Sequence, residues 1–144
     1  MRKQVIIILV ALLTISSLSF SATLNSLSRD QFIKTFVDNT SISIATDNLN
    51  GRTIENTFSM YLDDKGKVIG KMSHKPVNEH QTDNGMYSID EDGTAYITWQ
   101  HWDGAKKLCF HAFNTNNAYI AVGCDNVFHT AFMKEAIKSG NHLN

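Results

Sequence analysis

Cysteine and proline are both scarce in this 144-residue chain, which contains two cysteines and one proline. Two cysteines allow one disulfide at most, and the single proline, Pro76, leaves most of the chain free to form helices and strands. Three well-marked motifs are also missing: a glycine-rich phosphate loop, a G-x-S-x-G nucleophile elbow and a zinc spacing such as H-E-x-x-H. The sequence therefore lacks the signatures of nucleotide binding, of α/β-hydrolase catalysis and of zinc catalysis.

An excess of positive charge is absent too. The chain carries 13 basic and 14 acidic residues, a formal net charge of −1. Without a basic stripe of the kind that binds phosphate backbones, nucleic acid is not an expected partner. The length suits one domain with a modest core, so we expect a single domain over residues 22–144, and a monomer.

Six histidines and two acidic turns raise the question of a metal site. None of the histidines has a metal-ligand spacing. The turns Asp63-Asp64-Lys65-Gly66 and Asp90-Glu91-Asp92-Gly93 lack the alternate acidic positions and closing Glu of an EF-hand loop. Acidic residues followed by Gly are also what hairpin turns require. We therefore expect no metal and no cofactor.

The first 21 residues have the pattern of a secretory signal peptide. Arg2 and Lys3 form a positive start, and an uncharged apolar run follows over residues 5–15. That run fits the hydrophobic region of a signal and is shorter than the ~20 residues that cross a bilayer. We expect cleavage between Ser21 and Ala22. The alternative is an uncleaved anchor, but no stop-transfer charges follow the run. The protein is thus expected in the periplasm or the medium, without a stable membrane anchor.

The mature chain begins with a helix signal and continues with strand signals. Ser28-Arg29-Asp30-Gln31 is a capping box, and apolar residues recur at helical spacing over residues 32–37. The period then changes to two, which predicts strands at 57–62, 67–72, 86–90, 94–102, 107–114 and 118–124. The polar residues 73–84 predict an exposed loop.

Helical spacing returns at the C-terminus. It is carried by Val127, Phe128, Ala131, Phe132, Ala136 and Ile137, with Gly140 placed as the C′ stop. The whole pattern predicts an α+β domain, in which an antiparallel β-meander of about six strands is flanked by N- and C-terminal helices. It leaves open whether the sheet closes into a small barrel.

The two cysteines have positions that predict a disulfide. If Asn116-Asn117 is a two-residue turn, Thr115 lies opposite Ala118, and counting outward brings Cys109 opposite Cys124. Directly opposed residues have Cα atoms roughly 4.5–5.5 Å apart, a range that a disulfide accepts. A redox-active pair is the alternative, but such pairs usually have C-x-x-C spacing. We therefore interpret the bond as structural.

Two sets of residues are candidates for a functional site. Alternation along the strand at 94–102 places Trp99 toward the core, and Tyr96, Gln100 and Trp102 together on the opposite, exposed face. Exposed aromatic rings dominate contact energies, so this face is a candidate binding surface. The alternative for this face is that a helix or loop covers it. The second candidate is a polar site assembled from His101, Asp103 and His111.

A set of short motifs extends from Leu49 to Asn141. It consists of Tyr61, Gly66, Gly85-Met86-Tyr87, Asp92-Gly93, Trp99, Cys109-Phe110, Asn117-Ala118-Tyr119 and Gly140-Asn141. With these motifs the chain resembles the VirK-like family of small exported bacterial proteins of unknown function. The family has a Trp where Tyr87 stands and a Cys near Tyr96-Ile97. The resemblance implies a periplasmic or secreted protein associated with virulence, and it supplies no catalytic residues.

These observations give two expectations of function. The first is a non-enzymatic exported binding protein that holds a protein or small ligand on a sheet face or in a barrel mouth. The second is a small extracytoplasmic hydrolase or inhibitor that uses His101, Asp103 and His111. An apolar cavity would favour ligand binding, and a cleft containing those three residues would favour the second expectation.

Overall fold

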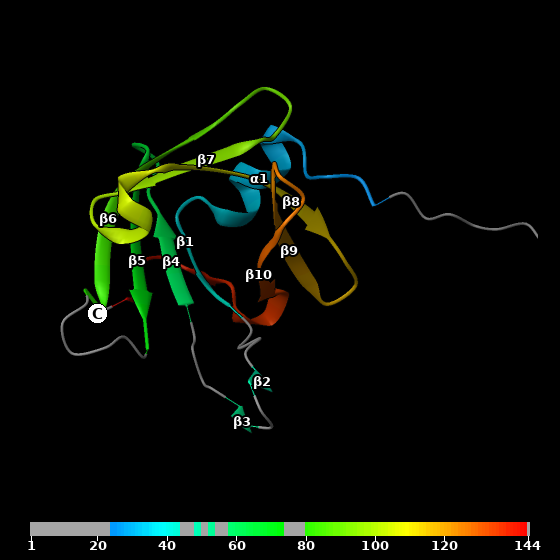
Figure 1. The fold of residues 1–144 in the computed structure, drawn as a ribbon. Coiled ribbons are helices and arrows are strands. Elements are labelled where there is room, and N and C mark those ends of the chain that lie inside the picture. The colour runs from blue at the N-terminus through cyan, green and yellow to red at the C-terminus, as the bar shows by residue number, and fades with distance from the viewer. Residues whose placement is uncertain (1–23, 44–47, 50–51, 54–57, 74–79, 144) are drawn as a thin grey trace, which may run out of the picture.

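The fold is an antiparallel sheet that curls around one short helix (Figure 1). The computed structural model describes residues 24–43, 48–49, 52–53, 58–73 and 80–143. The expected signal peptide and the cleavage site at Ser21 and Ala22 lie outside these residues. Among the described residues, no helix is long and apolar enough to span a bilayer.

Nine strands form the main sheet in the order β10-β9-β8-β7-β6-β5-β4-β1-β11. From β4 onward, each strand pairs with the next one along the chain until β10. The bounds are β1 (Asn39–Ile42), β4 (Phe58–Leu62), β5 (Lys67–Met72), β6 (Thr82–Ile89), β7 (Ala95–Trp99), β8 (Lys107–Asn114), β9 (Ala118–Gly123), β10 (Phe128–Met133) and β11 (Lys138–Ser139). A separate pair joins β2 (Asn48–Leu49) to β3 (Arg52–Thr53).

The helix α1 (Arg29–Phe36) confirms the predicted capping box. The Ser28 backbone N–H donates to Gln31 Oε1 at 2.9 Å, and the Gln31 N–H donates to Ser28 Oγ at 3.4 Å. Phe32 and Phe36 are buried on its inner face. Their rings contact aromatic side chains of three strands: Phe110 of β8, Tyr119 of β9 and Phe132 of β10. The helix therefore fills part of the space inside the curl.

The curl nearly brings the two sides of the sheet together. Ser43, just beyond β1, forms an isolated antiparallel bridge with Phe132 of β10. Ser43 is also bound to β4, since its N–H donates to the Phe58 carbonyl at 2.7 Å. The result is a curled half-barrel whose two sides are joined at this bridge.

This architecture corrects the predicted fold class. The chain is mostly β, with nine strands in the main sheet and one short α-helix among the described residues, instead of six strands flanked by two helices. The predicted C-terminal helix is wrong: residues 128–133 form β10, and the short 3₁₀ helix η2 (Lys134–Ala136) follows. The predicted loop at 73–84 is also too long, because β6 already begins at Thr82.

A β-bulge explains the C-terminal error. Phe128 pairs with Val122 and Thr130 pairs with Ala121, so His129 is an extra residue in β10. The bulge shifts the alternation by one residue, which breaks the period of two. The remaining spacing of apolar residues then imitates one face of a helix.

The β8–β9 hairpin confirms the predicted register and disulfide. His111 pairs with Val122, Phe113 pairs with Ile120, and the Thr115 N–H donates to the Ala118 carbonyl at 2.9 Å. Cys109 and Cys124 are joined, with their Cα atoms 5.5 Å apart. A disulfide of this kind is compatible with an exported protein.

Candidate functional site

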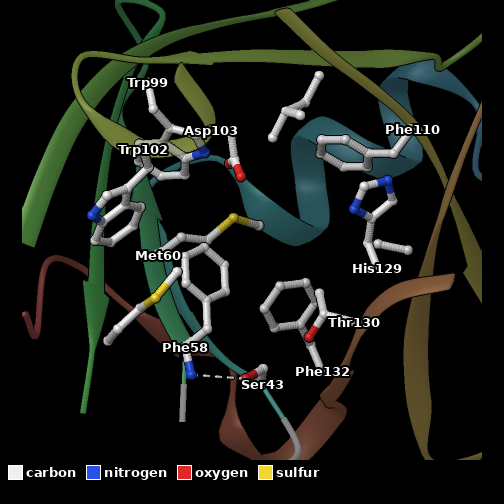
Figure 2. A pocket seen from close by; sticks show the side chains of 13 residues that line it. Ser43, Phe58, Met60, Trp99, Trp102, Asp103, Phe110, His129, Thr130 and Phe132 are labelled. Atoms are coloured by element: carbon white, nitrogen blue, oxygen red, sulfur yellow. Dashed lines mark hydrogen bonds between the residues drawn. The ribbon is translucent and has the colours of Figure 1, made fainter. Parts of the chain in front are cut away.

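The inner face of the curled sheet lines an open cavity of about 310 Å³ (Figure 2). Its wall comes from β4 and β5 on one side and from β8, β9 and β10 on the other. Strand β7 and the short 3₁₀ helix η1 (Trp102–Ala105) complete it. Most of the lining is aromatic or aliphatic: Phe58, Met60, Met72, Trp99, Trp102, Leu108, Phe110, Ala121 and Phe132. Four polar residues join them: Ser43, Asp103, His129 and Thr130.

Strand alternation places the apolar wall. Phe58 and Met60 are two residues apart on β4, and Leu108 and Phe110 are two apart on β8, so each pair shares one face of its strand. The sequence pattern predicts both strands. It does not show that the curl turns these two faces toward each other, because that depends on how far the whole sheet twists.

Two indole rings form one end of the cavity. Trp99 and Trp102 have ring centroids 4.9 Å apart, and the Phe58 ring meets both edge-on at about 6 Å. Gly70 of β5 makes room for them. A Cβ atom at Gly70 would lie 2.4 Å from the Trp102 ring and 2.7 Å from the Trp99 ring. The absence of a side chain at this inward position is what allows the two indoles to pack against the sheet.

The position of Trp102 corrects a prediction. Its side chain is 5% exposed and belongs to the core, so it does not share an exposed face with Tyr96 and Gln100. Alternation fails here because β7 ends at Trp99 and the chain then bends into η1. The Trp102 indole N–H donates to the His80 carbonyl at 2.8 Å, which fixes the ring on the inner side.

A buried carboxylate holds the start of η1. Asp83 of β6 is 1% exposed, and its Oδ2 accepts the backbone N–H groups of His101 and Trp102, both at 2.8 Å. Its Oδ1 accepts the Asn84 N–H and contacts His101 Nδ1, both at 2.9 Å. Burial by itself raises the pKa of Asp83, but the hydrogen bonds from Trp102, His101 and Asn84 outweigh it and hold the pKa below its ordinary value. The carboxylate therefore stays charged and keeps the turn in place.

His129 is a lining residue that the sequence did not single out. It is the extra residue of the β10 bulge, so its ring points toward the cavity from a position that alternation would not assign. The ring lies against Gly123, where an added Cβ would meet His129 Nε2 at 2.6 Å. A bulge leaves little signal in a single sequence, and the six histidines offer no spacing by which to choose this one.

The rest of the predicted binding face lies on the outer side of the sheet. Tyr96 is half-buried, and the Lys107 ammonium lies 4.0 Å from the centroid of its ring. Gln100 is exposed and lines a second hollow of about 710 Å³ over the outer face of β4–β7. That hollow has one sheet face as its floor, whereas the inner cavity has aromatic rings on opposing sides. We therefore take the inner cavity as the candidate site.

The polar alternative is not assembled. His101 is bound to Asp83 and stacks on the His80 ring, with centroids 4.1 Å apart. His111 lies elsewhere, on the outer face of β8, with its Nδ1 3.4 Å from Thr94 Oγ1 and its Nε2 3.9 Å from Cys124 Sγ. Asp103 lines the inner cavity. Among the described residues, no three His, Cys, Asp or Glu side chains form a group that could hold a metal ion.

Comparisons with protein-family models, with curated proteins and with solved structures give no match to this chain. The resemblance to the VirK-like family therefore stays a prediction.

Proposed function

We propose that this protein is an exported binding protein that holds a small, mainly apolar molecule in the cavity of its curled sheet. The observation that carries the proposal is the cavity itself: about 310 Å³, with five aromatic side chains in its wall and a few polar groups among them. This volume is at the lower end of the roughly 300–1,000 Å³ of ligand pockets, which suits one small molecule.

Export is part of the same proposal. The disulfide supports it, since such bonds persist outside the reducing cytoplasm, and the signal-like N-terminus is its second support. An association with virulence rests on the VirK-like resemblance alone. A hydrolase using His101, Asp103 and His111 is less favoured, because these residues have separate sets of neighbours.

The experiment is a fluorescence titration of the oxidised mature protein with N-phenyl-1-naphthylamine, a neutral apolar fluorophore. The chain contains two tryptophans, and both line the cavity, so Trp emission reports on the site without a label. We expect saturable binding with transfer of Trp excitation to the probe. Absence of saturable binding by a folded protein would overturn the proposal.

A matched pair of variants localises the probe. Ala121→Leu places a larger side chain on the cavity wall and should weaken binding at least several-fold, because the added carbons occupy space that the probe needs. Ala118→Leu makes the same chemical change on the same strand outside the lining and should leave binding unchanged. Equal binding by both variants would place the probe elsewhere.

A further inference from the structure

We propose that the ligand is a cationic amphiphile: a small molecule with an apolar or aromatic body and an amine that pairs with the Asp103 carboxylate. This inference rests on the proposed function and adds the chemical class of the ligand. It comes from the charge of the cavity, the conformation of η1 and the type of side chain in the wall.

The first observation is the position and charge of Asp103. Its carboxylate points toward the open space of the cavity, between the side chains of Trp102 and His129 (Figure 2). Among the described residues, no side chain forms an ion pair or hydrogen bond with it. Asp103 is an exposed residue, so its carboxylate is open to an incoming cation, and water partly screens the attraction between them.

The second observation is the composition of the lining. No described residue that lines the cavity is a lysine or arginine. A fatty acid or another anionic amphiphile would therefore bring a second negative charge to Asp103 without a lysine or arginine to balance it. A protonated amine has the opposite charge and balances the one already present.

The third observation is the backbone of η1. Asp103, Gly104 and Ala105 have φ values of 53°, 63° and 56°, three successive residues in the left-handed region. This conformation is unfavourable for Ala in particular, and it persists only where the surroundings enforce it. Here Asp83 binds the N–H groups at the start of η1, and His80 accepts the Trp102 indole N–H. The strained turn holds Asp103 over the cavity.

The fourth observation is the aromatic wall next to the carboxylate. The rings of Trp99, Trp102 and Phe58 pack together at that end of the cavity. Aromatic faces attract ammonium groups, with Trp the strongest of the three ring types, and they also bury an apolar body. A carboxylate with adjacent indoles thus matches both parts of an amphiphilic amine.

The experiment compares three probes with the same ring: 2-phenylethylamine, 2-phenylethanol and phenylacetate, which are cationic, neutral and anionic near pH 7. Calorimetric titration should show the amine binding about five-fold more tightly than the alcohol, a difference that a charge pair with an exposed carboxylate can supply. Phenylacetate should bind more weakly than the alcohol. Higher salt should reduce the advantage of the amine, because salt screens the charge pair.

Asp103→Asn is the decisive variant. Asn accepts the left-handed region at least as well as Asp, so the turn should keep its shape while the negative charge is lost. The ratio of amine to alcohol affinity should fall to about one. Glu91→Gln is the control: it removes the same charge from the exposed turn between β6 and β7, at the far end of β7 from η1, and should keep the wild-type ratio.

The outcomes separate this inference from the proposed function. If N-phenyl-1-naphthylamine binds but the amine has no advantage over the alcohol, the cavity remains the binding site and the amine class is wrong. The amine class is also wrong if Asp103→Asn keeps the wild-type ratio. If the folded protein does not bind the fluorophore, the proposed function itself fails, and the amine class fails with it.

Discussion

The Asp83 carboxylate and the His101 ring lie 2.9 Å apart, Oδ1 to Nδ1, and this contact joins the beginning of β6 to the turn that ends β7. His101 is half exposed, whereas Asp83 is buried. The pair therefore connects a fixed charge in the interior to an imidazole that reaches solvent. Because the same carboxylate also accepts the Trp102 N–H, the shape of the cavity depends on it.

Replacing Asp83 with Asn should destabilise the protein by about 1–3 kcal/mol. Both oxygens of Asp83 accept backbone N–H groups, so either orientation of the Asn amide places an NH₂ group against at least one N–H donor. Urea unfolding at pH 7 measures the change. Unaltered stability would mean that the hydrogen bonds contribute little, and Glu91→Gln controls for the loss of one negative charge.

Stability should also fall in acid through Asp83. Its folded-state pKa lies below the ordinary 3.8, so between these two values the unfolded chain binds the extra proton. The stability contributed by Asp83 is therefore present above about pH 4 and is lost as the pH drops through the folded-state pKa. Urea unfolding between pH 2 and pH 7 should show a shallower acid dependence in Asp83→Asn than in the wild type, and parallel curves would contradict this.

Both tryptophans should be essential for stability. Trp99→Ala and Trp102→Ala should each cost about 3–5 kcal/mol, the usual range for removing a buried aromatic ring. Since the rings touch, the double variant should cost less than the sum of the two. Thermal melts and urea unfolding curves of the two single variants and the double variant measure the cost of each single substitution and of the pair. A nearly neutral Trp102→Ala would contradict the buried position of that ring.

Gly70→Ala should destabilise the protein by about 1–3 kcal/mol, the typical cost of overpacking. The added methyl group would meet both indoles well inside van der Waals contact. Gly104→Ala serves as a comparison, because its Cβ would meet no atom within 4 Å and its cost is one of backbone conformation alone. If the indoles move in Gly70→Ala, Trp emission should shift, whereas Gly104→Ala should leave the emission unchanged.

Removing the disulfide should lower stability without changing the fold. The chain-entropy estimate for a loop of this size is about 3 kcal/mol, and we expect less because the β8–β9 pairing already holds the ends together. Cys109→Ala combined with Cys124→Ala should melt earlier and keep the circular dichroism spectrum of the wild type. Free thiols in protein purified without reductant would show that the bond is not formed.

Local patterns predicted local structure well. The capping box at Ser28 and the register from Asn116-Asn117 to Cys109 and Cys124 depend on residues near each other in sequence, and both are confirmed. The alternation of β4, β5 and β8 likewise gave the correct strands. These features need no knowledge of the rest of the chain.

The cavity depends on contacts that single-strand patterns do not contain. Trp102 faces inward because its backbone N–H donates to the carboxylate of Asp83, 19 residues earlier in the sequence. His129 faces inward because a bulge adds one residue to β10. In both places the backbone departs from regular alternation: at Trp102 a period of two was continued past the end of β7, and near His129 the bulge made a strand resemble a helix.

The bond between Cys109 and Cys124 also bears on how the chain folds. It joins Cys109 of β8 to Cys124, directly after β9, and these two strands lie between β7 and β10 in the sheet. In oxidised chains these two strands start close together, so closing the hairpin loop costs little entropy. On one side of this hairpin β7, β6, β5 and β4 are added in turn, and on the other side β10 is added. Each of these strands pairs with a strand that is its neighbour along the chain. The part of the sheet from β4 to β10 can thus grow outward from a covalently fixed hairpin, with few long-range searches, and such local assembly favours fast folding.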